Sequence, residues 1–487
     1  MSAFSLRNHP AAVRPFVYHA RPRKTLAITW VLGTLVIGWL LHHTAVLAGL
    51  IDYPAAYPVL FTLLFLLMGQ QLLMSWFEKP FDITPEQHNI VRQLKIGIVV
   101  PLYNEDESIL LRNLFALLDQ SRRPTRIVVV NDGSLNRQTG EAILYESVKN
   151  EWVAAAERAG VSTLWLYQSN AGKRHAQVTG FRHLTDVDII VTVDSDSMLD
   201  HYAIEEGVKP FIRTEVMSVG GVNIGINTHT NFLTRLSDLL HVQWQLVARG
   251  AQNAGGNITV NSGRLAFYRA KICLDNIEAY LGETFFGRRV EYSDDSMLTM
   301  FALSQGRAVQ QTTSITFTWH PENFDYLMRQ RLRWMRGWFI RSFWRFRYLP
   351  VKGYAFWSEA FDMLRLVLGT VVTVLVLIVR PVMFDRPLVW TLFVVPIVMT
   401  YLTSVKHLTI WHSDQSTHQR VLTFAMAPLV LIWAWLILRP LRLYAMATWF
   451  KTGWGTREVI EVVDHPTHQQ VGTPMPGLIR QIGVDGA

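Results

Sequence analysis

The chain has 487 residues, of which 50% are hydrophobic and 17% are charged. It is too apolar for an ordinary soluble protein and too charged for a bare bundle of membrane helices, so the composition predicts a soluble domain joined to membrane spans. The formal net charge of +8 predicts contact with anionic lipid or a phosphorylated substrate. Nucleic acid is not expected as a partner, because the sequence contains no helix-turn-helix, finger or RNA-binding signature. Cys273 is the only cysteine, which excludes an intrachain disulfide and a cysteine-based metal site.

Two apolar runs near the N-terminus predict membrane spans. Residues 25–48 and 57–76 are each long enough to cross a hydrocarbon layer of ~30 Å at ~1.5 Å per residue. Basic residues precede the first run, whereas the link between the runs contains neither Lys nor Arg. Positive charge marks the cytoplasmic side. We therefore expect a cytoplasmic segment over 1–24 and two transmembrane helices over 25–80, with the following chain in the cytoplasm.

Residues 95–320 have the pattern of an α/β domain. Strand-like runs at 96–101, 126–130, 163–167 and 188–193 alternate with helical sequence. This rhythm predicts a parallel sheet with crossover helices. The runs are continuously apolar, as expected for strands that are buried on both faces.

The sequence after this domain predicts helices at and in a membrane. A helix over 324–348 carries seven arginines and an aromatic-aliphatic face, which favours amphipathic interfacial helices over 321–355. The alternative is a soluble helix packed on its own domain. Three further apolar stretches predict transmembrane helices within 356–450, and a basic loop between two of them is expected inside; the stretches are 363–379, 388–403 and 421–438, and the loop is 406–420.

A pair of carboxylates, Asp194 and Asp196, follows the predicted strand 188–193. In open α/β sheets, ligands bind just outside the carboxyl ends of the strands. Two carboxylates at such a place can hold a divalent cation, which in turn can bind a diphosphate. The alternative is a surface turn, since Asp and Ser favour turns.

Two other polar turns lie earlier in the domain. Asp132, in an Asp-Gly-Ser turn, can accept hydrogen bonds from a base or a ribose; the alternative is an ordinary tight turn. Lys173 and Arg174 follow a glycine at a predicted helix start, which suits phosphate oxygens. The alternative there is a solvated basic turn.

Three later motifs complete the candidate site. The small residues Ser262 and Gly263 could approach a sugar ring. The adjacent Asp294 and Asp295 would raise each other's pKa if buried, which suits a general base, and they also suit a helix N-terminus. On the Arg-rich helix, an aromatic ring could stack on a pyranose while polar neighbours orient hydroxyls or phosphate; these residues are Gln330, Arg333 and Trp334.

The order of these motifs resembles that of the processive membrane β-glycosyltransferases of family 2, which include cellulose, chitin and hyaluronan synthases. The series is Asp-Gly-Ser, Gly-Lys-Arg, D-x-D, Ser-Gly-x, a double Asp and Q-x-x-R-W. Trp454 and Arg457 belong to a W-G-T-R motif that most resembles hyaluronan synthases. The resemblance covers 96–457. It implies an α/β GT-A-type nucleotide-sugar-binding domain inserted between transmembrane helices, with UDP-sugars, a growing polysaccharide and the lipid bilayer as partners.

The resemblance also implies a role for each donor-side residue. Asp132 would contact the uracil, with Lys173 and Arg174 near the nucleotide. Asp194 and Asp196 would bracket the donor, and Asp196 would bind Mg²⁺ or Mn²⁺. The leaving diphosphate would be flanked and then covered by four residues: Gln330, Arg333, Trp454 and Arg457.

On the acceptor side, Asp295, beside Asp294, would be the base that deprotonates the acceptor hydroxyl, and Trp334 would hold the acceptor sugar near Ser262 and Gly263. The W-G-T-R segment would act as a gate in the cytoplasmic segment 451–487. A gate over a cytoplasmic site requires an even number of crossings. We therefore expect either a break near Arg439-Pro440 or one apolar stretch that does not cross.

Polar residues within the predicted spans suggest a route for the polymer. Glu359, Asp362 and Arg365 recur every three residues, and Gln70 and Gln71 lie within an earlier span. Polar groups at such depth are costly and tend to line a pathway. The alternative is an interhelical pair that only fixes packing.

Two motifs depart from the hyaluronan-synthase pattern. Ser262-Gly263-Arg264 stands where Ser-Gly-Pro is usual, and Ser293-Asp294-Asp295-Ser296 stands where Gly-Asp-Asp-Arg is usual. The predicted product is a hyaluronan-like polymer of UDP-GlcNAc and UDP-GlcA, made by a multi-pass protein of the plasma (inner) membrane. The alternatives are a chitin-like or other β-linked polysaccharide, a single transfer to a lipid, or a non-catalytic membrane protein, which the intact carboxylates disfavour.

Overall fold

The structure is a computed structural model that describes residues 56–136, 139–228, 230–374, 377–378, 380–383, 391–409 and 416–451. The N-terminal segment 1–24, the predicted span 25–48, and Trp454 and Arg457 of the predicted gate lie outside these residues.

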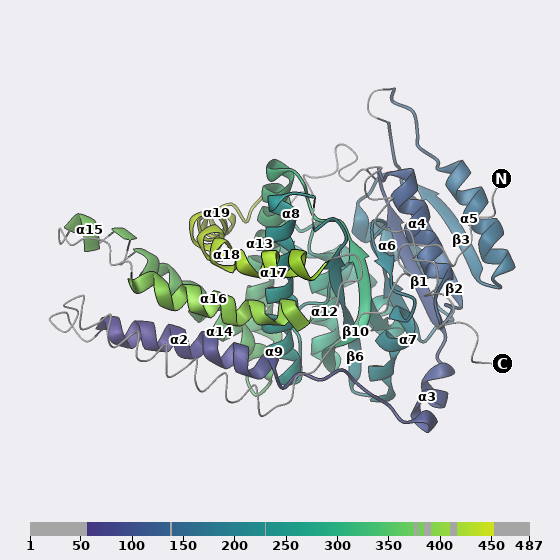
Figure 1. Cartoon of the computed structure of the whole chain (residues 1–487). Helices are drawn as coiled ribbons and strands as arrows, with labels where there is room; N and C mark the ends of the chain where they lie inside the picture. Colours follow the sequence, from purple (N-terminus) through teal and green to yellow (C-terminus); the bar gives the residue numbers. More distant parts are fainter. Residues whose placement is uncertain are drawn as a thin grey trace.

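A central eight-stranded sheet with the order β3-β2-β1-β4-β7-β6-β10-β5 forms the core of the molecule (Figure 1). Its strands are β1 Ile96–Leu102, β2 Arg126–Asp132, β3 Ser162–Gln168, β4 Ile189–Thr192, β5 Met198–Leu199, β6 Val216–Gly225, β7 Ala266–Arg269 and β10 Arg307–Thr318. All four strands predicted from the sequence are confirmed. A separate hairpin pairs β8 Thr284–Phe285 with β9 Arg288–Arg289.

The sheet is mixed, so the prediction of a parallel sheet holds for only part of it. Strands β1 to β4 are parallel, as are β6 and β10, but β7 runs antiparallel to both β4 and β6. The reason is local. The turn before β7 lies at the carboxyl edge of the sheet, so the strand that leaves it must run back, with Ala266 paired to Thr192.

Helices cover both faces of the sheet because side chains alternate along each strand. Ile98 and Val100 belong to one apolar cluster, with α4, α5 and α7, whereas Val99 belongs to the other, with α6, α10 and α12. The helices of the domain are α3 Pro85–Arg92, α4 Glu107–Leu118, α5 Glu146–Arg158, α6 Lys173–Arg182, α7 Ala203–Val208, α8 Phe232–Val242, α9 Arg249–Ala254, α10 Ala270–Leu274, α11 Ile277–Leu281 and α12 Asp294–Gln305, with the 3₁₀ segment η4 Lys209–Ile212 and the π-helical segment η5 Gln243–Ala248.

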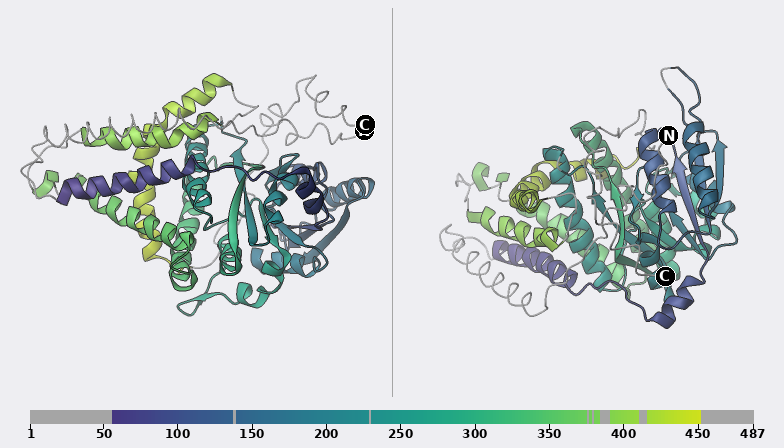
Figure 2. Two further views of the ribbon diagram at one scale, coloured as in Figure 1. Left: turned by 90° about the horizontal axis from the view of Figure 1, so that it is seen from below. Right: turned by 45° about the vertical axis from the view of Figure 1, so that its right-hand side comes forward.

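A second group of helices extends away from the sheet. In both views of Figure 2, α2, α14 and α16 project to the same side of the sheet. α2 contacts both α14 and α16. The elements of this group are α2 Ala56–Ser75, α14 Tyr354–Val374, α15 Arg380–Met383, α16 Thr391–Thr409, α17 Thr417–Ala425, α18 Ala427–Trp433, the π-helical segment η7 Ala434–Leu438 and α19 Arg439–Ala447.

Within the described residues, a single stretch, Ala427–Ala447, is long and apolar enough to cross a bilayer by length and composition. Helices do occur at the other predicted spans: α2 at 57–76, α14 at 363–379 and α16 at 388–403. Membrane crossing by these helices stays a prediction.

Two details of the C-terminal helices differ from expectation. The stretch does not turn back at Arg439-Pro440, because the π-helical η7 continues directly into α19, which contains Pro440 in its first turn. The expected basic loop 406–420 is shorter than predicted. Lys406 lies inside α16 and is fully buried, donating hydrogen bonds to the carbonyls of Ser75 and Leu246.

The Arg-rich helix is confirmed as α13 Phe324–Tyr348. It packs against α12, α14 and α19. Two of its arginines point into the protein: Arg341 pairs with Glu283 and Arg345 pairs with Glu359. Aromatic residues on the helix remain exposed, including Phe343 and Tyr348. α13 is therefore fixed to the α/β domain on one side, and its interfacial position stays a prediction.

Candidate active site

A cavity of about 730 Å³ lies at the carboxyl edge of β1, β2 and β4, and the start of α12 and the side of α13 close it. It brings together nearly all of the described residues that the sequence singled out. These are Asp132, Lys173, Asp194, Asp196, Ser262, Gly263, Asp294, Asp295, Gln330, Arg333 and Trp334. Arg174 is the described candidate that does not line the cavity.

Asp132 organises the loop that enters α6. Its carboxylate is 3% exposed and accepts hydrogen bonds from the Gln168 side chain and from the backbone N–H groups of Ala171 and Gly172, at 2.6, 3.0 and 2.8 Å. Burial raises the pKa of Asp132, and these hydrogen bonds act against that rise. The carboxylate thereby fixes the place where Lys173 begins its helix.

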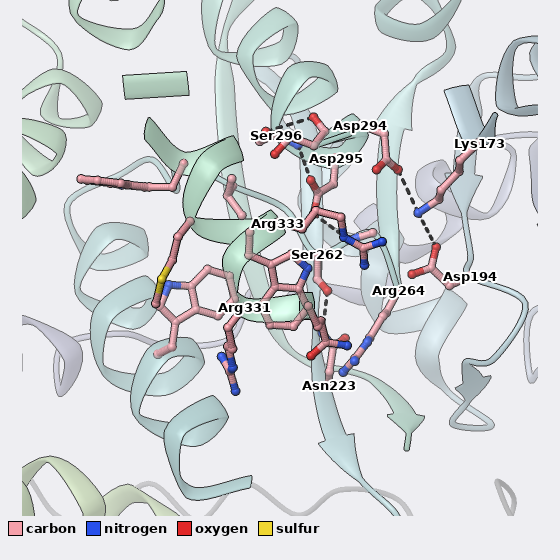
Figure 3. A pocket seen from close by; sticks show the side chains of 18 of the residues that line it. Lys173, Asp194, Asn223, Ser262, Arg264, Asp294, Asp295, Ser296, Arg331 and Arg333 are labelled. Carbon is pink, nitrogen blue, oxygen red and sulfur yellow. Dashed lines mark hydrogen bonds and ion pairs between the residues drawn. The ribbon is translucent and has the colours of Figure 1, made fainter. Parts of the chain in front are cut away.

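Lys173 links three segments of the site. Its Nζ lies 2.7 Å from Asp194 Oδ1 and 2.9 Å from Asp294 Oδ2 (Figure 3). Burial alone would lower the pKa of Lys173, but the two carboxylates outweigh it and raise the pKa. The ion pairs hold the end of β4 against the start of α12, although these segments are a hundred residues apart in sequence.

Neighbouring side chains support the turn that carries Asp194 and Asp196. Asn113 donates to the Asp194 carbonyl at 2.9 Å, and Ser195 donates to Glu105 at 2.6 Å. Both carboxylates line the cavity. Among the described residues, no group of three or more His, Cys, Asp and Glu side chains could hold a metal ion. Two carboxylates nevertheless suit Mg²⁺, which is commonly bound by one or two of them together with substrate phosphates.

A left-handed residue and a helical glycine position the double Asp. Ser293 has φ 62°, an uncommon conformation for a residue with a Cβ, and α12 begins directly after it. Gly337 of α13 packs against this turn. A Cβ at Gly337 would lie 1.9 Å from Ser293 Oγ and 3.0 Å from Ser293 Cβ, so any larger residue would force the Ser293 side chain to move. The packing of α13 thus sets where Asp294 and Asp295 point.

Asp295 has the environment of a base. Burial, and then the negative charge of Asp294, raise the pKa of Asp295 to about 6. Its Oδ2 accepts the Gly263 N–H at 3.2 Å, which brings the Ser-Gly turn to the carboxylate. For Asp294, burial would raise the pKa, but Lys173 outweighs it and lowers the pKa. Two adjacent carboxylates thereby acquire different proton affinities.

Gly263 lies close to three of the charged side chains of the site. A Cβ placed there would lie 3.4 Å from Lys173 Nζ and 3.7 Å from both Asp194 Oδ2 and Asp295 Cβ. The neighbouring Ser262 hydroxyl accepts a hydrogen bond from Asn223 Nδ2 at 2.6 Å. This turn therefore sits between the charged cluster and the rest of the cavity.

Trp334 and Gln330, both on α13, line the cavity as well. The Trp334 ring is 37% exposed and meets His241 edge-on, with the ring centroids 5.8 Å apart. Gln330 is buried, and its Oε1 has no hydrogen-bond partner within the described residues. An aromatic face beside a polar edge is the combination that binds a sugar ring.

Arg174 lies outside the cavity in a buried network. Its guanidinium donates to Glu283 at 2.7 Å and to the carbonyls of Tyr280 and Tyr292. Glu283 also accepts from Arg341 and from Trp344. Burial would raise the pKa of Glu283, but Arg341 and Arg174 outweigh it and lower the pKa. Arg174 therefore ties α6 to α13 instead of facing the cavity.

Sequence reasoning did not single out four residues that contribute to the site: Asn223, Gly337, His241 and Arg331. A glycine inside a long helix, where it costs about 1 kcal/mol, was a signal for close packing at Gly337. Asn223 and His241 belong to β6 and α8 and carried no local pattern. Only the tertiary fold brings them to Ser262 and Trp334.

Comparison with known proteins shows the family to which the chain belongs. The family described as glycosyltransferase like family 2 matches residues 93–337. The hyaluronan synthase of Streptococcus pyogenes serotype M1 is 31% identical over 407 residues, which are 83% of this chain and 90% of that protein. An N-acetylglucosaminyltransferase of Azorhizobium caulinodans is 30% identical over 50% of this chain and 59% of its own length.

Among solved structures, a mannosyltransferase from Pyrobaculum calidifontis, in complex with GDP-Man and Mn²⁺, has a TM-score of 0.49 and 18% identity, covering 80% of this chain and 97% of that one. The family match and the hyaluronan synthase relative show the family of the chain without this structural likeness. The chain is a glycosyltransferase with the expected GT-A-like α/β fold, and it belongs to glycosyltransferase-like family 2.

Proposed function

We propose that this glycosyltransferase is processive: it polymerises UDP-GlcNAc and UDP-GlcA by inverting transfer and extrudes a hyaluronan-like polysaccharide across the plasma (inner) membrane. The supporting observation is the extent of the cavity. Its wall includes Asp132 and Lys173 at the sheet edge, and also Gln71 of α2, Asp362 of α14 and Arg442 of α19. One continuous space therefore links the charged cluster to the helices that project from the sheet.

The polar residues on α14 divide into two roles under this proposal. Asp362 lines the cavity and is paired with Arg365, whereas Glu359 is fully buried and accepts from Arg345 and Ser342. Asp362 would line the route of the polymer. Glu359 would fix the packing of α14 on α13.

The donor would occupy the side of the cavity near Asp132. Asp132 would contact the uracil, Lys173 the diphosphate, and Asp194 the donor sugar. Asp196, with Asp194, would hold Mg²⁺ or Mn²⁺, which when bound would neutralise charge on the departing UDP. Gln330 and Arg333, on α13, would donate to the same diphosphate as it leaves.

The acceptor would rest on Trp334, with its hydroxyl directed toward Asp295. Asp295 would take the proton of this hydroxyl as the hydroxyl attacks the anomeric carbon. A carboxylate with a pKa of about 6 is largely deprotonated at neutral pH and still basic enough to share the proton in the transition state. Asp294 would keep Lys173 in place.

A membrane-embedded enzyme with a cytoplasmic catalytic domain would fit this geometry. The domain boundaries would be those expected from the sequence: 25–80 and 356–450 in the membrane, 95–320 in the cytoplasm and 321–355 at the interface. Ala427–Ala447 supports a crossing by length and composition.

Digestion of the product tests the proposal. Purified full-length protein in lipid nanodiscs is supplied with Mn²⁺ and both UDP-sugars, and the polymer is treated with a hyaluronan-specific lyase. We expect complete depolymerisation, and no long polymer when either UDP-sugar is omitted. The similarity to N-acetylglucosaminyltransferases favours one other product, a β-linked GlcNAc chain. A lyase-resistant polymer formed from UDP-GlcNAc alone would identify it, and one sugar per acceptor would remove the processive step.

A further inference from the structure

Two arginines on the acceptor side of the cavity, the buried Arg264 and the half-buried Arg331, have buried side-chain donors without acceptors. Arg264 is 8% exposed, and its Nη1 has no hydrogen-bond partner within the described residues. The same holds for Nε and Nη2 of Arg331. Both residues line the cavity. Buried polar groups are nearly always paired, so a set of unpaired donors that faces a cavity indicates a ligand that accepts from them.

The fully buried arginines of this region have carboxylate partners, although Nε of Arg174 and Nε of Arg345 also lack a hydrogen-bond partner within the described residues. Arg174 and Arg341 share Glu283, and Arg345 pairs with Glu359. Arg264 and Arg331 form no ion pair in the part of the chain that the structure describes. Burial, and then the positive charge of Arg264, lower the pKa of Arg331 to about 10. The two guanidiniums therefore repel each other, and an anion between them would relieve the repulsion.

Arg264 and Arg331 lie near Trp334, the residue proposed to hold the acceptor sugar. The Arg331 guanidinium lies over the Trp334 ring, 5.1 Å from its centroid. Burial, and then the neighbouring His320, Arg331 and Arg264, keep the pKa of His241 well below its usual value, so this ring is neutral and supplies no counter-charge. In Figure 3 the side chains of Arg264 and Arg331 extend away from Asp294 and Asp295.

We propose that Arg264 and Arg331 bind the carboxylate of a uronic acid residue of the growing polymer. The inference rests on the proposed function and adds the groups that distinguish a charged sugar from a neutral one next to Trp334. A guanidinium can donate two parallel hydrogen bonds to the two oxygens of a carboxylate. An N-acetylglucosamine residue at the same place has no charge to match them.

The donor diphosphate is the other anion near the cavity. It would sit by Asp132 and Lys173, where the Asp194 and Asp294 carboxylates already pair with the lysine. The unpaired guanidiniums belong to the Trp334 side, so the geometry favours the sugar carboxylate.

A binding experiment tests this inference on the full-length protein in nanodiscs. The probes are a hyaluronan tetrasaccharide with glucuronate at its non-reducing end and the same tetrasaccharide with its carboxyl groups reduced to alcohols. We expect the reduced form to bind about tenfold or more weakly, because it loses charge-assisted hydrogen bonds. Equal affinity for the two forms, or no measurable binding of either, would overturn the inference.

The variants Arg264→Gln and Arg331→Gln assign the effect to these side chains. Each should bind the charged tetrasaccharide about tenfold more weakly and lose most of the discrimination between the two forms. Arg264→Lys should keep part of it, since lysine retains the charge without the fork of donors. The matched control is Arg347→Gln, which removes the same charge from an exposed position on the same helix and should change neither affinity.

UDP affinity, measured on the same samples, separates the remaining outcomes. Unchanged UDP binding in Arg264→Gln shows that the variant is folded and that the donor side is intact. A loss of UDP affinity with retained discrimination between the tetrasaccharides would assign the pair to the diphosphate and overturn the inference. Failure of the proposed function would be seen separately, as a lyase-resistant product or none.

Discussion

The two sides of the cavity satisfy their charges in different ways. On the donor side, Lys173 is paired with Asp194 and Asp294, and Asp132 accepts three hydrogen bonds. On the acceptor side, the buried Nη1 of Arg264 and the buried Nε and Nη2 of Arg331 have no hydrogen-bond partner within the described residues.

This difference separates geometry that the protein fixes by itself from geometry that a ligand must complete. Paired charges hold the end of β4 and the start of α12 in place in the free protein. Unpaired buried donors cost free energy until an acceptor arrives, so their contribution appears as affinity and selectivity. The donor side should thus govern the rate of transfer, and the acceptor side should govern which sugar is bound.

Asp295 stands between the two sides, and its replacement should have the largest effect. Asp295→Asn keeps an oxygen for the Gly263 N–H but cannot take a proton. We expect transfer to fall about 10²- to 10⁴-fold, measured as UDP release with both UDP-sugars present. Asp275→Asn, at an exposed position after α10, serves as the control. Undiminished UDP release would show that Asp295 is not the base.

Replacing Glu283 tests whether Arg174 stabilises the fold of the domain or binds the donor. Glu283→Gln removes the one carboxylate shared by the buried Arg174 and Arg341. Leaving buried charge uncompensated should cost about 3 kcal/mol of unfolding free energy. Thermal unfolding in nanodiscs, compared with that of the exposed control Glu278→Gln, measures it. An unchanged melting temperature together with weaker UDP binding would show that Arg174 contributes to nucleotide binding, as the sequence predicted.

Trp334→Ala should impair the acceptor side alone. Loss of the aromatic platform should weaken acceptor binding about tenfold, while hydrolysis of UDP-sugar by water stays close to normal. Trp334→Phe should be milder, because it keeps a ring. The test is acceptor titration alongside a hydrolysis assay. Equal loss in both assays would contradict the division of the cavity into two sides.

The pH dependence of the reaction should show the smallest effect. Asp295 must be deprotonated to act as a base, so kcat/KM should rise with pH through about 6 and level off above it. Asp294→Asn removes a negative neighbour, which lowers the pKa of Asp295. The rise of kcat/KM with pH should then occur at lower pH. The pKa of Asp295 should not return fully to its ordinary value, because burial still raises it. A rise of kcat/KM at higher pH in this variant would contradict the conclusion that the charge of Asp294 raises the pKa of Asp295.

Much of the architecture could be predicted from local pattern. The four predicted strands, the extent of α13 and the convergence of the carboxylates all follow from apolar runs and the polar turns that end them. The direction of β7 could not be predicted, because a four-residue strand carries no sign of its orientation. Nor could the place of Arg174: its motif neighbour Lys173 faces the cavity, and the next residue on a helix points elsewhere.

Local pattern along the chain is enough to predict which chemical groups meet at the carboxyl edge of the sheet, because neighbouring residues encode the strand ends and the turns that follow them. How those groups are partnered depends on contacts between distant segments. Pairing of Lys173 with Asp294, contact of Gly337 with Ser293, and the approach of Arg264 to Arg331 all join segments far apart in sequence. Burial and charge at such contacts depend on distance in space, which no local pattern records.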